Sequence, residues 1–556
     1  MAKNNSDRVD YFALVSSHGE APLDPQAIED GLLVATADIG AHTSSKRQEH
    51  ISTLLSRFVY TDRDRHGAKG TSLALTLLKT LGRQADDSDE LGTEQALTGL
   101  LKLALEMKDL AEKDSDIYEQ PSKYAVDACN EALTCVANTM LLLPKTRELV
   151  ANGCHGTDAV DVLLRSKLAD VAATAFLCGR CLLLSLESPV AATCCVSSLD
   201  LPTTLARVIR SYLDRHESVV SGDRFSPQQV MSELFKAAMS LCVYYQRSIP
   251  RVATSDISAS SDDSLPPEHA AKFIDILKIC LDVLNDSSLS ATGHLSDAAK
   301  QAIVIALNFP TRSPDAILRC WLPGDHDQNS EDLLAEQSRY RNVDCIYQLF
   351  GTLVDAAVSE TTTDGSELYS NEITPLALVL VRLVAEHEDV RSRIFHQIFP
   401  KDADYEVLPE DRPGLSGKLV RLMRMPQGGM LSGAIGDFLL ALLGQDVAKF
   451  VLAAGYGNAA GYMLARGIAI PESVLKQVAD DAEHMVDPVT GRYMDPAGGK
   501  ALADMTDEEK EREAERLFVL FERLNKTGFI KVDNPVRAAM ESGRFQEVEE
   551  DSSGDS

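Results

Sequence analysis

Two features of this sequence have residue types and spacing that could do chemistry, and the first is a pair of thiols. Cys178-Gly-Arg-Cys181 has the spacing of a redox or zinc-binding pair. No second pair accompanies it, and it lies within an apolar run of helical character. We therefore interpret these residues as buried structural thiols.

The second feature is a glycine cluster near residue 455. Its spacing is GxGxxxG, whereas a dinucleotide-binding loop needs GxGxxG between a strand and a helix. A helical pattern precedes the cluster, so we interpret it as a corner between two helices, where glycine ends one helix and lets backbones approach closely. The residues of this predicted structural motif are Gly455, Gly457, Asn458 and Gly461.

Other signatures of catalysis or ion binding fail when they are examined residue by residue. The sequence contains no GxxxxGK[ST] phosphate loop, no HExxH and no GxSxG. A segment starting at Asp62 resembles a calcium loop, but Leu73 stands where a bidentate glutamate is required. These observations predict a binding scaffold without a metal site, a cofactor or catalysis of bond chemistry.

Composition limits the partners and the compartment. The 556 residues carry a net charge of −30 with a pI near 4.8, which argues against nucleic acid and favours basic protein surfaces. The eleven cysteines form no disulfide framework, which favours a reducing compartment. The first residues lack the apolar region of a signal peptide, and no apolar run reaches 18 residues, so we expect neither a signal peptide nor a transmembrane segment.

The elements that must position any site are helices, because apolar residues recur at helical spacing nearly throughout. Stripes of this kind occupy residues 51–59, 73–81, 97–105, 133–140, 231–242, 273–284 and 346–354. They recur on a loose scale of about 40–60 residues, as in helical arrays. We predict an all-α fold in which residues 46–467 form an armadillo/HEAT-like superhelix, with polar loops at 253–268, 323–332 and 359–371.

Several of these stripes carry one polar residue among apolar neighbours. In armadillo arrays, the helices that line the concave groove present such side chains to an extended peptide, where they hold backbone carbonyls or a terminal carboxylate. The alternative is that each side chain is solvated or satisfied locally. The candidate groove residues are Lys79, Arg83, Asn138, Arg180, Lys236 and Asn308.

Three blocks near the C-terminal end carry a resemblance to a known family. They are KLVRLM followed by FLLALL and GYGNAAGYMLARG between residues 418 and 467, DPVTGR at 487–492, and MTDEEKEREA at 505–514 followed by Leu517, Phe521 and Leu524. Their order resembles the synembryn family (resistance to inhibitors of cholinesterase), which comprises exchange factors and folding chaperones for heterotrimeric G-protein α subunits. Before residue 417 the resemblance rests on pattern.

The resemblance implies a function by binding alone. A concave groove would hold the C-terminal tail of the α subunit, GDP would leave, and the empty subunit would be held until GTP binds. The six candidate residues above match the basic and asparagine residues that line the family's groove. The resemblance further implies a monomer that forms a 1:1 complex in the cytoplasm, with recruitment to the plasma membrane through the G protein.

The region after residue 467 changes character. We predict a weakly ordered segment or first helices at 1–45, an acidic linker at 468–504, a partner-binding helix at 505–530 and an acidic, disordered tail at 531–556. Thr506 and Glu509 form a capping box at the start of that helix. The residues that share its apolar face, with which it would contact the switch region of the α subunit, are Leu517, Phe518, Phe521 and Leu524.

Few serines of this sequence have the acidic context of a phosphorylation site. The linker lacks the acidic phosphorylation site of animal family members, and the serines followed by an acidic residue at the third position are Ser260 and Ser552. The alternative function is an armadillo-type adaptor that binds extended peptides without affecting nucleotide release. The three blocks favour the exchange factor, because a peptide-binding array does not need them.

Overall fold

The computed structural model describes residues 44–60, 67–118, 122–215, 224–249, 265–286, 293–312, 314–323, 333–359, 365–400, 407–424, 429–468 and 506. All regular secondary structure in these segments is helical, which confirms the predicted all-α class. The chain divides into two compact units. The first comprises Met1–Ala403 with Glu410–Asp446, and the second comprises Asp404–Pro409 with Val447–Ser556.

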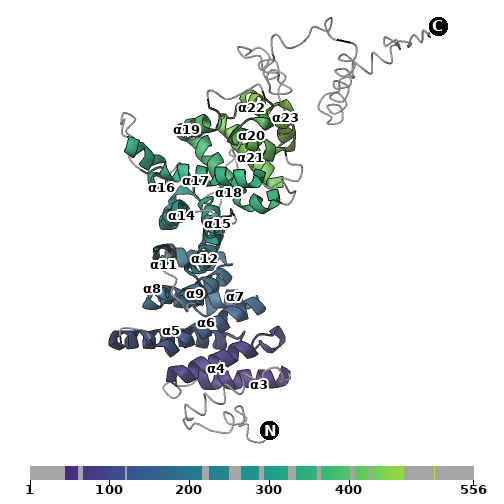
Figure 1. The fold of residues 1–556 in the computed structure, drawn as a ribbon. Coiled ribbons are helices and arrows are strands. Elements are labelled where there is room, and N and C mark those ends of the chain that lie inside the picture. Colours follow the sequence, from purple (N-terminus) through teal and green to yellow (C-terminus); the bar gives the residue numbers. More distant parts are fainter. Residues whose placement is uncertain are drawn as a thin grey trace, which may run out of the picture. The chain divides into compact units, whose positions relative to one another are not determined.

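The first unit is built from helices that follow one another along the chain (Figure 1). Their bounds are α3 (Ser44–Leu54), α4 (Gly67–Leu81), α5 (Glu94–Tyr118), α6 (Lys123–Leu142), α7 (Thr146–Glu148), α8 (Gly156–Arg165), α9 (Ala172–Ser185), α10 (Pro189–Ser197), α11 (Leu201–Leu213), α12 (Pro227–Ser248), α13 (Pro267–Ala270), α14 (Ile274–Asp286), α15 (Asp297–Ala306), α16 (Asp315–Trp321), α17 (Leu333–Ser359), α18 (Gly365–Glu386), α19 (Glu388–Ile398), α20 (Leu415–Met423) and α21 (Gly429–Leu442). Short 3-10 or π-helical turns lie at Leu55–Val59, Ala85–Asp87, Leu149–Gly153, Lys167–Asp170, Ala271–Phe273 and Pro409–Asp411.

These helices stack in two rows. Each of α4, α6, α9, α12, α15, α18 and α21 packs on the next, and we call this set the α4–α21 row. Helices α5, α8, α11, α14, α17 and α20 do the same and form the α5–α20 row. Sequence neighbours such as α5 and α6, or α11 and α12, join the rows. Such stacking is the arrangement expected of a helical repeat array; its assignment to the armadillo or HEAT type stays a prediction.

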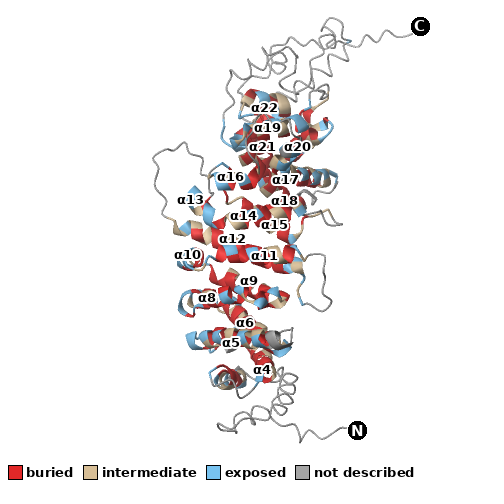
Figure 2. Ribbon diagram, turned by 90° about the vertical axis from the view of Figure 1, so that its left-hand side faces the viewer, coloured by how far each residue is buried: buried red, intermediate tan, exposed pale blue. Residues whose placement is uncertain are grey.

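The predicted apolar stripes form the core of this unit. Leu77, Leu100, Phe235, Leu277 and Phe350 are all fully buried, and each comes from a different stripe. Figure 2 shows buried residues concentrated where neighbouring helices meet. Burying one such side chain stabilises the fold by about 1.5–3 kcal/mol, so a helix with an apolar stripe is driven onto the helix before and after it. This is why periodicity alone predicted the stripes correctly.

The start of α12 is fixed by a capping box. Ser226 Oγ accepts a hydrogen bond from the backbone N–H of Gln229 at 3.2 Å, and Gln229 Oε1 accepts one from the N–H of Ser226 at 2.9 Å. Pro227 occupies the first turn, where its missing N–H costs nothing. The chain therefore enters α12 in one direction, which also places the two residues before the cap.

The second unit contains α22 (Val447–Ala454) and α23 (Tyr456–Ala465), where the rings of Phe450 and Tyr462 pack edge to face at 5.4 Å. Gly455 lies between the two helices with a φ of 80°, which favours glycine, so the predicted corner is present. The predicted close backbone approach is wrong for Gly457 and Gly461, because a Cβ at either would meet open space. Asn458 Nδ2 donates to the carbonyl of Ala454 at 2.8 Å.

One predicted loop is also corrected. Of the expected loop at 359–371, residues from Gly365 onward belong to α18, whose polar first two turns hid its helical character. The expectations for residues 1–43, the linker, the helix at 505–530 and the tail fall outside the described residues, apart from Thr506. None of the described helices is long and apolar enough to cross a lipid bilayer.

Candidate functional site

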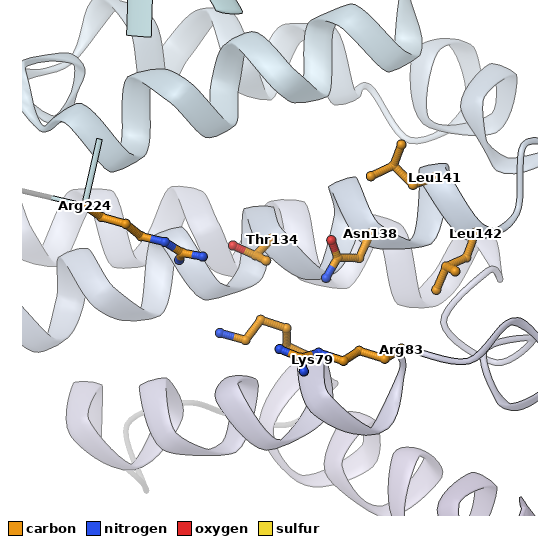
Figure 3. A pocket seen from close by; sticks show the side chains of 7 residues that line it. All are labelled: Lys79, Arg83, Thr134, Asn138, Leu141, Leu142 and Arg224. Atoms are coloured by element: carbon orange, nitrogen blue, oxygen red, sulfur yellow. The ribbon is translucent and has the colours of Figure 1, made fainter. Parts of the chain in front are cut away.

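Three of the predicted residues line one pocket. Lys79, Arg83 and Asn138 surround a cavity of about 390 Å³ between α4 and α6. Figure 3 shows the ends of Arg83 and Asn138 facing each other and the amine of Lys79 directed toward the side of Thr134 and Arg224, with Leu141 and Leu142 at the other end of the cavity. We call this cavity the cationic pocket; its full lining is Lys79, Arg83, Thr134, Asn138, Leu141, Leu142 and Arg224.

The polar groups of the cationic pocket differ in how far they are satisfied. Lys79 Nζ lies 2.5 Å from Oε2 of Glu131, and the side chains of this ion pair are only 15% and 17% exposed. Arg83 is exposed and contacts no carboxylate within the described ranges. The amide of Asn138 likewise makes no side-chain hydrogen bond to any residue that the structure describes. The pocket therefore offers a cation and an amide to an anionic group, next to an apolar surface.

Two further predicted residues line a second cavity of about 290 Å³. Arg180 of α9 and Lys236 of α12 both pair with Glu233, whose side chain is 2% exposed, and the Lys236 distance is 3.3 Å. The backbones approach closely here, because a Cβ on Gly179 would lie 3.3 Å from the backbone of Glu233. The remaining lining residues are Phe176, Ser226, Gln228, Gln229, Ser232 and Asp297.

Asn308 has a local role in the structure. It follows the end of α15, and its Nδ2 donates to the carbonyls of Val304 at 3.1 Å and Ile305 at 3.2 Å. Both carbonyls belong to the last turn of α15, where a helix end leaves carbonyls without an intrahelical partner, and that of Ile305 also accepts the backbone N–H of Asn308 at 2.9 Å. Asn308 lines neither cavity described above, so its predicted contact with a ligand has no geometric support here and stays a prediction.

All six predicted residues lie on or at the end of consecutive helices of the α4–α21 row: Lys79 and Arg83 at the end of α4, Asn138 on α6, Arg180 on α9, Lys236 on α12 and Asn308 after α15. The stack sets them along one row, but only Lys79, Arg83 and Asn138 share one cavity, and Arg180 and Lys236 share another. Sequence reasoning missed Arg224. Its signal was the capping box that starts two residues later, which fixes the chain at this point.

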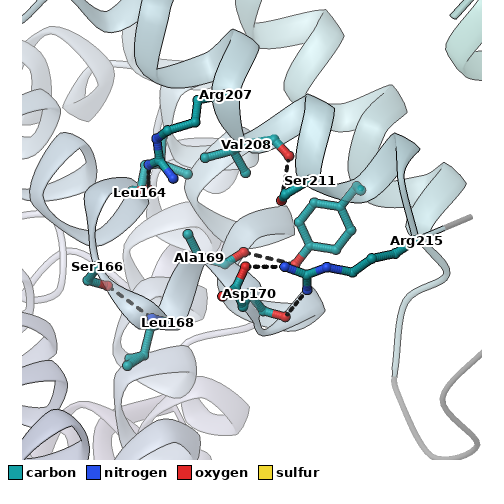
Figure 4. Close-up of polar contacts among 10 residues, drawn as sticks. Leu164, Ser166, Leu168, Ala169, Asp170, Arg207, Val208, Ser211 and Arg215 are labelled. Atoms are coloured by element: carbon teal, nitrogen blue, oxygen red, sulfur yellow. Dashed lines mark hydrogen bonds and ion pairs between the residues drawn. The ribbon is translucent and has the colours of Figure 1, made fainter. Parts of the chain in front are cut away.

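The cations of the α5–α20 row are used differently. Arg215 pairs with Asp170 (Figure 4). Tyr212 Oη donates to the carbonyl of Ala169 at 2.9 Å. Arg207 donates to the carbonyl of Leu164 at 2.6 Å. These bonds tie α11 to the preceding repeat and leave those arginines engaged within the fold, in contrast to Arg83.

The predicted structural thiols are buried. Cys178 and Cys181 lie on α9, and burial raises the pKa of both, that of Cys181 to about 12, so neither is a reactive thiolate near neutral pH. Within the part of the chain that the structure describes, no group of three His, Cys, Asp or Glu side chains is placed to hold a metal ion.

The remaining predicted sites lie outside the described residues. They are the two serines, Ser260 and Ser552, and the apolar face of the C-terminal helix, Leu517, Phe518, Phe521 and Leu524.

The sequence of this chain matches a known protein family. Residues 74–544 match the family described as guanine nucleotide exchange factor synembryn. Chaperone Ric-8 of Drosophila pseudoobscura pseudoobscura is 24% identical over 450 residues, which cover 77% of this chain and 75% of that protein.

Two mammalian relatives match over shorter regions. Chaperone Ric-8A of Bos taurus is 25% identical over 297 residues, 47% of this chain and 53% of the relative. Chaperone Ric-8A of Macaca fascicularis is 31% identical over 169 residues, which cover 29% of this chain and 32% of the relative. The matched region thus spans about half the length of the cattle protein and a third of the macaque protein. Because the family match extends over well more than half of the sequence, this chain belongs to the guanine nucleotide exchange factor synembryn family.

Proposed function

We propose that this chain is an exchange factor and folding chaperone for heterotrimeric G-protein α subunits. Family membership supports the class of activity. The observation that carries the proposal for this chain is the cationic pocket, where Lys79, Arg83 and Asn138 come together although one of them lies more than fifty residues from the others. Such a pocket suits the carboxylate end of an extended peptide, such as the C-terminal tail of an α subunit.

The mechanism requires no bond chemistry. The α-subunit tail continues the helix whose base supports the guanine ring, so holding the tail in the cationic pocket loosens the nucleotide site and GDP leaves. The chain must then bind the empty subunit more tightly than the GDP-bound one, since only differential affinity shifts the equilibrium. GTP binding reverses this preference and releases a 1:1 complex. Affinity for an open, partly folded subunit would also make the chain a chaperone.

The C-terminal helix would supply the second contact. Leu517, Phe518, Phe521 and Leu524 share one face by helical spacing, and we propose that this face contacts the switch region and holds the empty state. The encounter takes place in the cytoplasm, at the plasma membrane when the G protein is bound there. The serines Ser260 and Ser552 are proposed phosphorylation sites.

The test is release of a fluorescent GDP from a purified α subunit. We would compare the full chain, a variant cut after Gly467, the charge reversal Arg83→Glu, and Arg319→Glu as the control. Arg319 is an exposed arginine on α16 that lines neither cavity.

We expect acceleration by the full chain and by the control, and reduced acceleration by the other two variants. Binding of the α subunit without acceleration would instead favour the peptide-binding adaptor. Absence of binding would contradict the proposal as a whole.

A further inference from the structure

Arg224 is the cation of the pocket that sequence reasoning did not identify. It lines the same cavity as Arg83, and it reaches in from the segment before α12, whereas Arg83 lies at the end of α4. Figure 3 shows Thr134 of α6 next to the ends of Arg224 and Lys79. Arg224 is exposed, and it pairs with no carboxylate among the residues that the structure describes.

A stack of aromatic rings holds Arg224 in place. Its guanidinium lies 5.3 Å from the ring centroid of Phe225. That ring stacks on Phe176 of α9 with centroids 3.9 Å apart and planes at 7°. On Phe176 lies a second guanidinium, that of Arg180, at 5.3 Å, and Arg180 pairs with the buried carboxylate of Glu233. The capping box at Ser226 fixes the backbone beside this stack.

The charges of the pocket are therefore unequal. Lys79 is neutralised by Glu131, so the two lining cations that pair with no carboxylate of the described segments are Arg83 and Arg224. They come from different segments, one just after α4 and the other just before α12, and approach the cavity separately. Arginine binds a carboxylate through two parallel hydrogen bonds, so each of them can hold one carboxylate.

We propose that the cationic pocket recognises two carboxylates on one peptide, and that Arg224 is the residue that selects for the second. Arg83 holds the terminal carboxylate, Leu141 and Leu142 contact an apolar side chain at the peptide end, and Arg224 binds an acidic side chain a few residues earlier. Phe176 acts as a positioning residue, because it contacts Arg224 only through Phe225. The proposal rests on the tail binding proposed above, and it names the feature that decides which tails bind.

The test uses the full chain and an eleven-residue α-subunit tail peptide with one acidic side chain near its free C-terminal carboxylate. A second peptide carries the matching amide at that side chain, and a third ends in a C-terminal amide. Affinities are measured by fluorescence anisotropy for the unsubstituted chain, Arg224→Gln, Arg83→Gln and the control Arg319→Gln.

We expect Arg224→Gln to weaken binding of the acidic peptide about tenfold, the size expected for a lost charge-assisted hydrogen bond. It should leave the affinity for the side-chain amide peptide unchanged. Arg83→Gln should weaken binding of the peptides that end in a free carboxylate and leave the affinity for the peptide that ends in a C-terminal amide unchanged. Phe176→Leu alone should lower the affinity for the acidic peptide. In a chain that already carries Arg224→Gln, Phe176→Leu should lower this affinity no further.

Two results would overturn the inference while tail binding stands. One is an equal loss of affinity for all three peptides in Arg224→Gln, which would mean that Arg224 contributes only to the overall positive electrostatic potential of the pocket. The other is no loss at all. If the unsubstituted chain binds none of the peptides, both this inference and the proposed tail binding fail, whereas GDP release measured with the intact α subunit reports on the exchange activity separately.

Discussion

The guanidinium of Arg180 pairs with the carboxylate of Glu233, and this pair joins α9 to α12 beside Gly179, where the two backbones approach closely. Glu233 is 2% exposed and Arg180 is 33% exposed, so one partner is buried and the other can reach water. Lys236 adds a second cation to the same carboxylate at 3.3 Å. A buried carboxylate thus connects two helices of the α4–α21 row and supports the aromatic stack under Arg224.

Removing this buried charge should destabilise the fold. Glu233→Gln keeps the shape but leaves two cations without their counter-charge, and we expect a loss of about 1–2 kcal/mol in the free energy of unfolding, because the partial exposure of Arg180 limits the penalty. Urea unfolding measures this change in the free energy of unfolding. The matched control is Asp89→Asn, which breaks the exposed pair with Lys145 and should change stability by less than about 0.5 kcal/mol. Equal losses in both variants would contradict the structural role of Glu233.

Gly179 should not tolerate a large side chain. Its position against the backbone of Glu233 and Leu234 leaves no room, and we expect Gly179→Leu to lower the free energy of unfolding by about 1–3 kcal/mol through overpacking. The contrasting substitution is Gly461→Ala in α23, where a Cβ meets open space. It should stabilise α23 by up to about 1 kcal/mol, because alanine favours the helix interior. Thermal unfolding of both variants tests the pair; stabilisation by Gly179→Leu would refute the close packing.

Alkaline pH should weaken the fold through its buried thiols. Burial raises the pKa of Cys129 and of Cys181 to about 12, whereas an unfolded thiol titrates near pH 8.5. Between these values the unfolded chain has lost protons that the folded chain keeps, so the free energy of unfolding falls as pH rises. At pH 10 the loss should be about 1–2 kcal/mol per thiol.

The measurement is the urea midpoint at pH 7.5 and at pH 10. Replacing both residues, as Cys129→Ala with Cys181→Ala, should make the decrease smaller, although the variant starts from lower stability. Cys194 is exposed, so Cys194→Ala should leave the decrease as it was. A pH dependence that is the same in all three proteins would assign it to other groups.

A carboxylate in place of Asn138 should compete with the ligand. Asn138→Asp introduces an anion into the pocket lined by Lys79 and Arg83, and we expect about a tenfold loss of affinity for the tail peptide. Because the site is partly solvated, the free energy of unfolding should change by less than about 1 kcal/mol. Anisotropy titrations at low and high salt measure the affinity for the tail peptide, and urea unfolding measures the stability. Asn138→Gln is the uncharged control. Unchanged affinity in Asn138→Asp would remove this pocket from the tail-binding site.

The sequence by itself determined the helical class and most of the core, since an apolar stripe such as that of Leu277 or Phe350 can be buried only against another helix. It also identified Arg83 and Asn138 as polar residues out of place among apolar neighbours. It could not assign Asn308, whose amide is used by its own helix end, nor Gly457 and Gly461, which face open space.

Only the tertiary structure decided which charges remain available. Lys79 and Arg83 look alike in the sequence, but Glu131 lies 2.5 Å from the first and no described carboxylate pairs with the second. Arg224 enters the same pocket because α12 stacks on α9 and α9 on α6. Such pairing depends on distances between residues far apart in the chain, and these are set by how the helices stack and not by local periodicity.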